Sequence, residues 1–207
     1  SKPFAKLLSR GQLESYPQLA GATRYRLSLE IAESLSEVSG SLEVRFTNRQ
    51  PQVLERIVFF LFPNLTPGSM QIREPRVQGR EIEPLFPERA RGSLLVLPLP
   101  EPLDPGERVV VSLSYTLRVP SSEDGEYGGL GLGRNVLSLA YAYPMIPAFE
   151  SWEGEVPVPY GDFLHSEVSF YLAKVTFPSR LILAAPGVEL ARASTEGRTE
   201  VLLALGP

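Results

Sequence analysis

Thr23-Arg24-Tyr25-Arg26-Leu27-Ser28-Leu29-Glu30-Ile31 is the stretch of sequence that decides the fold. Apolar and polar side chains alternate along it, and the apolar set is Tyr25, Leu27, Leu29 and Ile31. A period of two predicts a half-buried β-strand, because successive side chains of a strand point to opposite faces. The pattern returns after Gly40, and the polar run Asn48–Pro51 separates it from the apolar run Val53–Phe62, which predicts two hairpin-like connections.

Further strands follow along the chain, with turn signals between nearly all of them. They are predicted at Gln71–Val77, Glu81–Phe86, Leu94–Leu97, Arg108–Val119, Val136–Ala142, Glu167–Phe177, Leu181–Ala185, Val188–Ala193 and Thr199–Leu205. The clearest turn is Asp104-Pro105-Gly106-Glu107, since proline presets the second position of a type II turn and glycine accepts the positive φ of the third.

The sequence therefore predicts an all-β fold. No long window keeps the helical period of about 3.6 residues, and short strands at regular spacing are typical of a β-sandwich or of curved, saddle-like sheets, antiparallel or mixed, with long loops. Residues 1–21 are expected to be a lead-in segment, and residues 22–207 a single β domain.

Composition excludes several classes of function. The formal net charge is −4 and no basic run occurs, which argues against a nucleic-acid partner. With no cysteine, the chain has no thiol nucleophile, disulfide or thiolate metal site. The longest apolar run, Ile57–Phe62, is too short to span a bilayer, so no transmembrane segment is expected. The compartment stays open, since an extracytoplasmic or membrane-anchored parent and a cytoplasmic one are both compatible with the sequence.

Two long loops bracket the predicted strand Val136–Ala142. The first, Pro120–Arg134, is rich in glycine, and the second, Tyr143–Gly161, is rich in proline. Loops of this length in a compact domain are typically functional or docked on something. The pattern Gly129-x-Gly131-x-Gly133 lacks the following helix and lysine of a phosphate-binding loop, so we expect a flexible or tightly turning loop and no nucleotide.

Candidate catalytic groups are few. His165 is the only histidine, and its neighbours Asp162, Ser166 and Glu167 lie too close in sequence to form a triad with it, which favours a structural or surface role. The loop acids Glu150, Glu153, Glu155 and Asp162 could supply a carboxylate pair for glycoside hydrolysis or bind calcium, although acids on a loop are usually solvated.

The same region is aromatic. It contains Tyr141, Tyr143, Phe149, Trp152 and Tyr160. Such a loop is typical of a surface that docks against a partner, while the alternative is that the rings cover the end of the domain's own core.

Several segments, in chain order, resemble the N-terminal β domain of zinc aminopeptidases of the membrane-alanyl-aminopeptidase type, including the bacterial, lipoprotein-like branch. The segments are Tyr25–Ile31, Ser39–Val44, Leu54–Asn64 (L-x-x-I-x-F-x-L-x-P-N), Pro102–Glu107, Leu113–Tyr115, Tyr143–Pro147, Gly161–Glu167 and Ala184–Gly187. Ala142 replaces a usual tryptophan, and the Thr-Gln pair that reaches the substrate's amino end in many relatives is not recognisable, so no substrate-contact residue is carried over.

The resemblance implies that zinc is held by H-E-x-x-H and a distant glutamate in a following catalytic domain. We therefore expect this chain to have no cofactor, metal site or catalytic residue of its own, and to pack on that domain and help form the peptide-binding cleft. The candidate interface or cleft-facing residues are Tyr141, Tyr143, Glu150, Trp152 and Asp162. The parent would be an aminopeptidase or a degenerate relative.

Two other hypotheses remain open at this stage. A free-standing sandwich could bind carbohydrate or protein on a platform of Tyr141, Tyr143 and Trp152. A carboxylate-based hydrolase would need a concave cleft with paired acids.

Overall fold

The period-two stretches form strands in the computed structural model, which describes residues 19, 21–65, 69–121, 129–133, 135–152 and 166–206. The strands in these ranges are β1 (Thr23–Ile31), β2 (Glu37–Thr47), β3 (Leu54–Phe60), β4 (Ser69–Val77), β5 (Arg80–Glu81), β6 (Leu94–Leu103), β7 (Arg108–Arg118), β8 (Leu130–Gly133), β9 (Val136–Leu139), β10 (Ser169–Pro178), β11 (Val188–Thr195) and β12 (Arg198–Leu205). The 3₁₀ helices are η2 (Phe62–Leu65), η3 (Glu88–Ala90) and η4 (Phe149–Trp152). The described part is all-β and sandwich-like, with mixed and antiparallel sheets, which confirms the predicted fold class.

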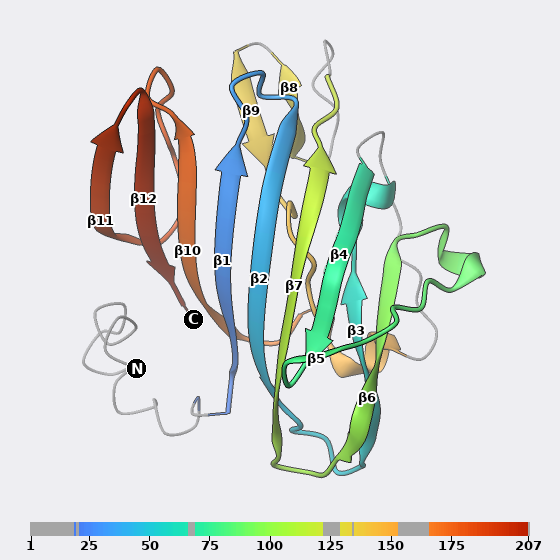
Figure 1. Cartoon of the computed structure of the whole chain (residues 1–207). Helices are drawn as coiled ribbons and strands as arrows, with labels where there is room; N and C mark the ends of the chain where they lie inside the picture. Colours follow the sequence, from blue (N-terminus) through green and yellow to red (C-terminus); the bar gives the residue numbers. More distant parts are fainter. Residues whose placement is uncertain are drawn as a thin grey trace.

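One large sheet organises the described residues. Its eight strands run in the order β11-β12-β10-β1-β2-β7-β4-β5, and Figure 1 shows the seven from β11 to β4 from the left to the right of the view. Strand β1 pairs antiparallel with β2 and parallel with β10, so that Thr23 lies opposite Ser169. The middle of the sheet therefore joins an early strand to a late one.

The two faces of this sheet differ as the alternation predicts. Along β2, every second residue from Val38 to Phe46 is buried, and the residues between them point outward. The inner face packs on β3, where Ile57 and Phe59 are fully buried, and one apolar cluster joins both layers. The continuous apolar run of β3 is explained by its burial in this second layer.

Strand β6 is longer than predicted because it tolerates prolines. It continues through Pro98, Pro100 and Pro102 as the partner of β3 in a two-stranded sheet. Proline has no N–H to donate, and an edge strand does not need every one. On its other side, among the residues that the structure describes, β6 makes only an isolated bridge between Val96 and Leu85, ahead of the first proline.

Two predicted strands are wrong. Residues 181–185 are not a strand, because no neighbouring strand hydrogen-bonds to them in the described structure. Of the predicted strand Glu81–Phe86, only Glu81 lies in a strand, β5, which pairs with β4, and Leu85 makes the isolated bridge. Alternation of apolar and polar side chains indicates an extended backbone, but an extended segment becomes a strand only when a neighbouring strand pairs with it.

The segment around the glycine-rich motif also differs from its prediction. Leu130–Gly133 is not a loop but strand β8, which pairs antiparallel with β9. Strand β9 ends at Leu139, before the predicted end at Ala142. A strand rather than a helix follows the glycines, as expected from the sequence. Residues 1–18 and 20 of the lead-in lie outside the described residues, so that segment stays a prediction.

The Asp104–Glu107 turn is confirmed. Gly106 has a φ of 84°, and the Glu107 N–H donates to the Asp104 carbonyl oxygen over 3.0 Å. Buried Asn48 fastens this turn to the end of β2, since its carbonyl oxygen accepts from the Gly106 N–H and its side-chain amide donates to the Leu103 carbonyl oxygen.

Candidate functional site

Three tyrosines from distant parts of the sequence meet on the inner side of the sheet. Tyr25 of β1 stacks on Tyr171 of β10, with ring centroids 4.8 Å apart, and Tyr143 meets both rings edge-on at 6.0 and 5.8 Å. Burial raises the pKa of Tyr25 and of Tyr143, with a further increase from the neighbouring Tyr171. Tyr25 and Tyr143 therefore act as hydrogen-bonding, packing groups rather than as acids.

The segment that carries Tyr143 is fixed on two sides. Ile146 N–H donates to the Tyr25 hydroxyl over 3.0 Å. Met145 and Phe60 exchange two backbone hydrogen bonds, of 2.7 and 3.1 Å, which attach the segment to the end of β3. The position of Tyr143 is thus set by β1, β3 and β10 together.

Trp152 is part of the core. It lies on η4, is only 6% exposed, and donates its indole N–H to the Pro147 carbonyl oxygen over 3.1 Å. Its ring packs on Phe46 and Phe149, with centroids 5.9 and 5.2 Å away. A ring platform for sugars needs exposed faces, and Trp152 offers none in this structure.

Tyr141 is partly exposed and has an unusual backbone. Its φ is 57°, in the left-handed region that a bulky residue seldom adopts, and its ring lies 5.1 Å from that of Phe62. This conformation follows the last residues of β9 and turns the chain toward Tyr143. A strained backbone conformation persists only where the surrounding structure holds it in place, and such residues are concentrated at functional sites.

The remaining predicted residues belong to the acidic stretch that begins at Glu150. The backbone of Glu150 belongs to η4, and its side chain is outside the described part. Asp162, Glu153, Glu155 and His165 also lie outside the described residues. The hypothesis of a carboxylate pair in this loop therefore stays a prediction.

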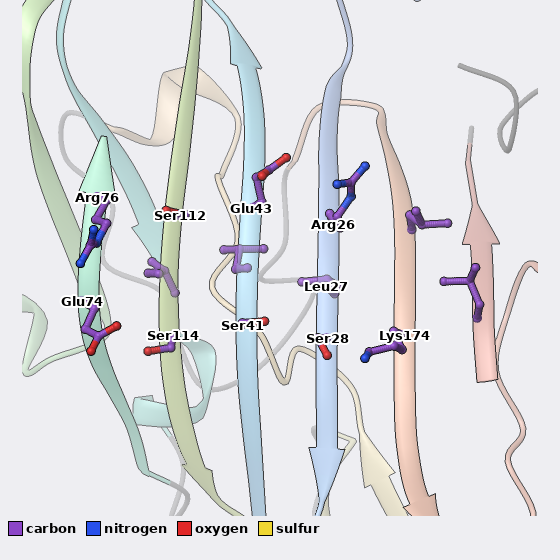
Figure 2. A pocket seen from close by; sticks show the side chains of 14 residues that line it. Arg26, Leu27, Ser28, Ser41, Glu43, Glu74, Arg76, Ser112, Ser114 and Lys174 are labelled. Carbon is purple, nitrogen blue, oxygen red and sulfur yellow. The ribbon is translucent and has the colours of Figure 1, made fainter. Parts of the chain in front are cut away.

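The sequence did not reveal a groove on the opposite, outer face of the sheet. It has a volume of about 520 Å³ and is lined by side chains of β1, β2, β4, β7, β10 and β12. Ser28, Ser41 and Ser114 stand opposite one another across three strands, with Lys174 next to Ser28 (Figure 2). Short serine side chains leave the floor of the groove open.

A row of three charged residues and one further serine borders Ser28, Ser41 and Ser114. Arg26, Glu43, Ser112 and Arg76 occupy matching positions on β1, β2, β7 and β4 (Figure 2). Glu43 accepts from the Arg45 guanidinium over 3.2 Å. No base hydrogen-bonds to the serine hydroxyls among the described residues, so the groove can form polar contacts but has no activated nucleophile. Its signal in the sequence is the outward serines, whose alignment depends on the register between strands.

No metal site is formed by the described residues, since no group of three or more His, Asp or Glu side chains there could hold an ion. The residues in these ranges therefore do not fit a zinc ion.

Comparison with solved structures gives a consistent result. A mutant M1 zinc metallopeptidase from Deinococcus radiodurans superimposes with a TM-score of 0.61 at 18% identity, over 88% of this chain and 38% of that chain. The M1 zinc metallopeptidase from the same organism gives 0.59 with the same identity and coverage. A two-domain M1 zinc metallopeptidase mutant bound to L-arginine also gives 0.59. The chain shares its fold with part of these enzymes.

The chain spans 38% of the length of these structures, so the region it matches is a minor part of each. No family model matches the sequence, and no curated protein matches it. At 18% identity the likeness establishes the fold, which agrees with the architecture that the sequence resemblance implied.

Proposed function

We propose that the chain is the non-catalytic N-terminal domain of a zinc aminopeptidase-like metallopeptidase. It packs on a catalytic domain of the same polypeptide, which carries the zinc, and helps to form the peptide-binding cleft. The observation that supports this most is the superposition of 88% of the chain on 38% of two-domain M1 zinc metallopeptidases.

The face around Tyr141 and Tyr143 is the side proposed for the cleft. Tyr141 is partly exposed and conformationally constrained, and Tyr143 is held in place by contacts with Tyr25 and Tyr171. A rigid, aromatic wall of this kind suits a surface that positions a peptide without reacting with it. Glu150 and Asp162 belong to the same proposal as residues of the adjoining loop.

The free-standing binding module has less support. Its platform required an exposed Trp152, whose ring is enclosed by Phe46 and Phe149.

The experiment compares the 207-residue chain with the product of the complete reading frame, each supplied with zinc and amino-acyl anilides. We expect the frame to encode H-E-x-x-H downstream, the full product to hydrolyse the anilides, and a chelator to abolish that activity. Hydrolysis by the 207-residue chain alone, or a frame without a second domain, would refute the proposal.

A further inference from the structure

The connection between β10 and β11 exposes an uncharged, apolar segment. Residues 181–187 read Leu-Ile-Leu-Ala-Ala-Pro-Gly. Leu181 and Leu183 pack partly against the main core, while Ile182 between them is 97% exposed. An exposed apolar stretch of this kind is unusual on a free surface and marks an interaction site.

The backbone of residues 182–185 also lacks strand partners in the described structure. Strands β10 and β11 are both antiparallel to β12, so the connection must return along the sheet before β11 begins. Its described hydrogen bonds lie at the start, from Ser179 N–H to the Gly197 carbonyl oxygen and from Leu181 N–H to that of Pro178. Residues 182–185 belong to no strand pair in the described structure. An extended segment without a partner can bind one through its main chain.

The segment is held firmly at both ends. Before it, the Arg180 guanidinium pairs with the Glu33 carboxylate and also donates to the Glu33 carbonyl oxygen over 2.6 Å. After it, Gly187 has a φ of 94°, and a Cβ there would lie 2.4 Å from the Ala204 carbonyl oxygen. Contacts at both ends restrict the segment, which lowers the entropic cost of binding.

The segment also continues the aromatic face described above. A Cβ on Gly187 would lie 2.7 Å from Leu205 Cγ, and Leu205 stands opposite Tyr171 across β12 and β10. The Tyr171 ring lies 5.8 Å from that of Tyr143. One partner can therefore reach both regions, and Leu205 is the last residue of the strand next to the segment.

We propose that residues 181–187 form a docking surface for the catalytic domain of the parent polypeptide, with Ile182 as the main apolar contact. The inference rests on the proposed function, and it adds the surface on which that domain sits. The catalytic domain suits the site because solved chains of this fold are longer than this one. In addition, Leu205 at the end of β12 lies beside Gly187, so the end of β12 is close to the segment. An anionic membrane suits it less, since Arg180 and Arg198 are both paired with Glu33.

Amide hydrogen exchange tests the proposal. In the isolated 207-residue chain, the amides of residues 182–185 are expected to exchange rapidly, since they have no backbone partner among the described residues. In the full-length parent they should be protected, while those of β2 behave alike in both proteins. Equal rapid exchange in an active, two-domain parent would overturn this inference and leave the proposed function standing. Protection that rises with the concentration of the isolated chain would also overturn it, by identifying a second copy as the occupant.

A matched pair of variants locates the contact. Ile182→Glu in the parent should abolish the protection and make the junction between the domains sensitive to protease. Leu85→Glu, at an apolar residue that is 52% exposed beside β6, should do neither. Because Ile182 contacts little within the domain, Ile182→Glu should leave the Tm of the isolated chain unchanged, which separates lost docking from misfolding. Retained protection in a folded Ile182→Glu parent would contradict the proposal.

Discussion

The backbone N–H of Ile146 donates a hydrogen bond to the hydroxyl oxygen of Tyr25 over 3.0 Å, although the two residues are 121 positions apart in the sequence. This bond ties β1 to the segment that carries Tyr143. Tyr25→Phe removes the acceptor and leaves a buried N–H unpaired, which should lower the free energy of unfolding by about 1–3 kcal/mol. Urea denaturation measures the change.

Tyr115 provides the control for that substitution. Its hydroxyl is buried without a hydrogen-bond partner among the described residues. Tyr115→Phe should therefore be neutral or stabilising, since it removes an unsatisfied polar atom. If both variants lost the same stability, the bond to Ile146 would not be the cause.

Gly40 is required by the ring opposite it. A Cβ at this position would lie 2.1 Å from Tyr115 Cζ, so Gly40→Ala must displace the ring and should destabilise the chain by about 1–3 kcal/mol. Gly21→Ala is the matched control, because its new methyl group meets nothing closer than Thr47 Cγ2 at 3.9 Å. Thermal unfolding of both variants checks the prediction, and similar Tm values for the two would count against it.

Trp152 should behave as a core residue. As the only tryptophan, it reports its surroundings by fluorescence, and we expect a blue-shifted native emission that iodide barely quenches. Trp152→Ala should cost about 3–5 kcal/mol of unfolding free energy, as for other large core residues. Phe86→Ala, at a residue that is 46% exposed, should cost far less. Native emission as red and as readily quenched as in urea would show that the ring is exposed.

Glu33 should make the stability of the domain weakly dependent on pH in the acid range. Hydrogen bonding to Arg180, and then to Arg198, lowers the pKa of this carboxyl group from its ordinary value. A lowered folded-state pKa stabilises the fold above the unfolded-state pKa, and the contribution is lost as the pH falls through the folded-state pKa. The effect should be small and sensitive to salt, since the group is exposed.

The measurement for Glu33 is the Tm of the wild type and of Glu33→Gln between neutral pH and pH of about 3. The difference between the two proteins should shrink toward acid. Glu37→Gln, at an exposed residue of β2, serves as the control. A difference that stayed constant or grew in acid would exclude the carboxylate as its source.

The sequence predicted what depends on local alternation. The inner and outer faces of β1 and the turn at Asp104–Glu107 follow from neighbouring residues, and both are present. Residues 181–185 alternate as a strand does, with Ile182 outside and Leu181 and Leu183 partly buried, but pairing depends on distant strands that alternation cannot locate. The strand at Pro98–Pro102 was missed for the opposite reason. Proline argues against a strand unless the strand is known to lie at the edge of its sheet.

The sequence predicted some residues of the candidate site but not their arrangement. The sequence drew attention to Tyr141, Tyr143 and Trp152, but could not distinguish the enclosed indole from the partly exposed phenols. Tyr25 and Tyr171 were missed as members of the cluster, because the parallel pairing of β1 with β10 is what brings them together. The serine groove was missed for the same reason, since its serines line up only once β1, β2 and β7 are in register.

The parallel pairing of β1 with β10 also has a consequence for synthesis on the ribosome. Strand β1 emerges early, yet the neighbour on its open edge, beginning at Ser169, is among the last parts of the described chain to be made. Contacts between such distant segments slow folding, and an unpaired edge is prone to aggregate while it waits. During synthesis the open edge of β1 can therefore pair incorrectly until β10 has been made. A chain truncated before residue 169 should yield insoluble protein.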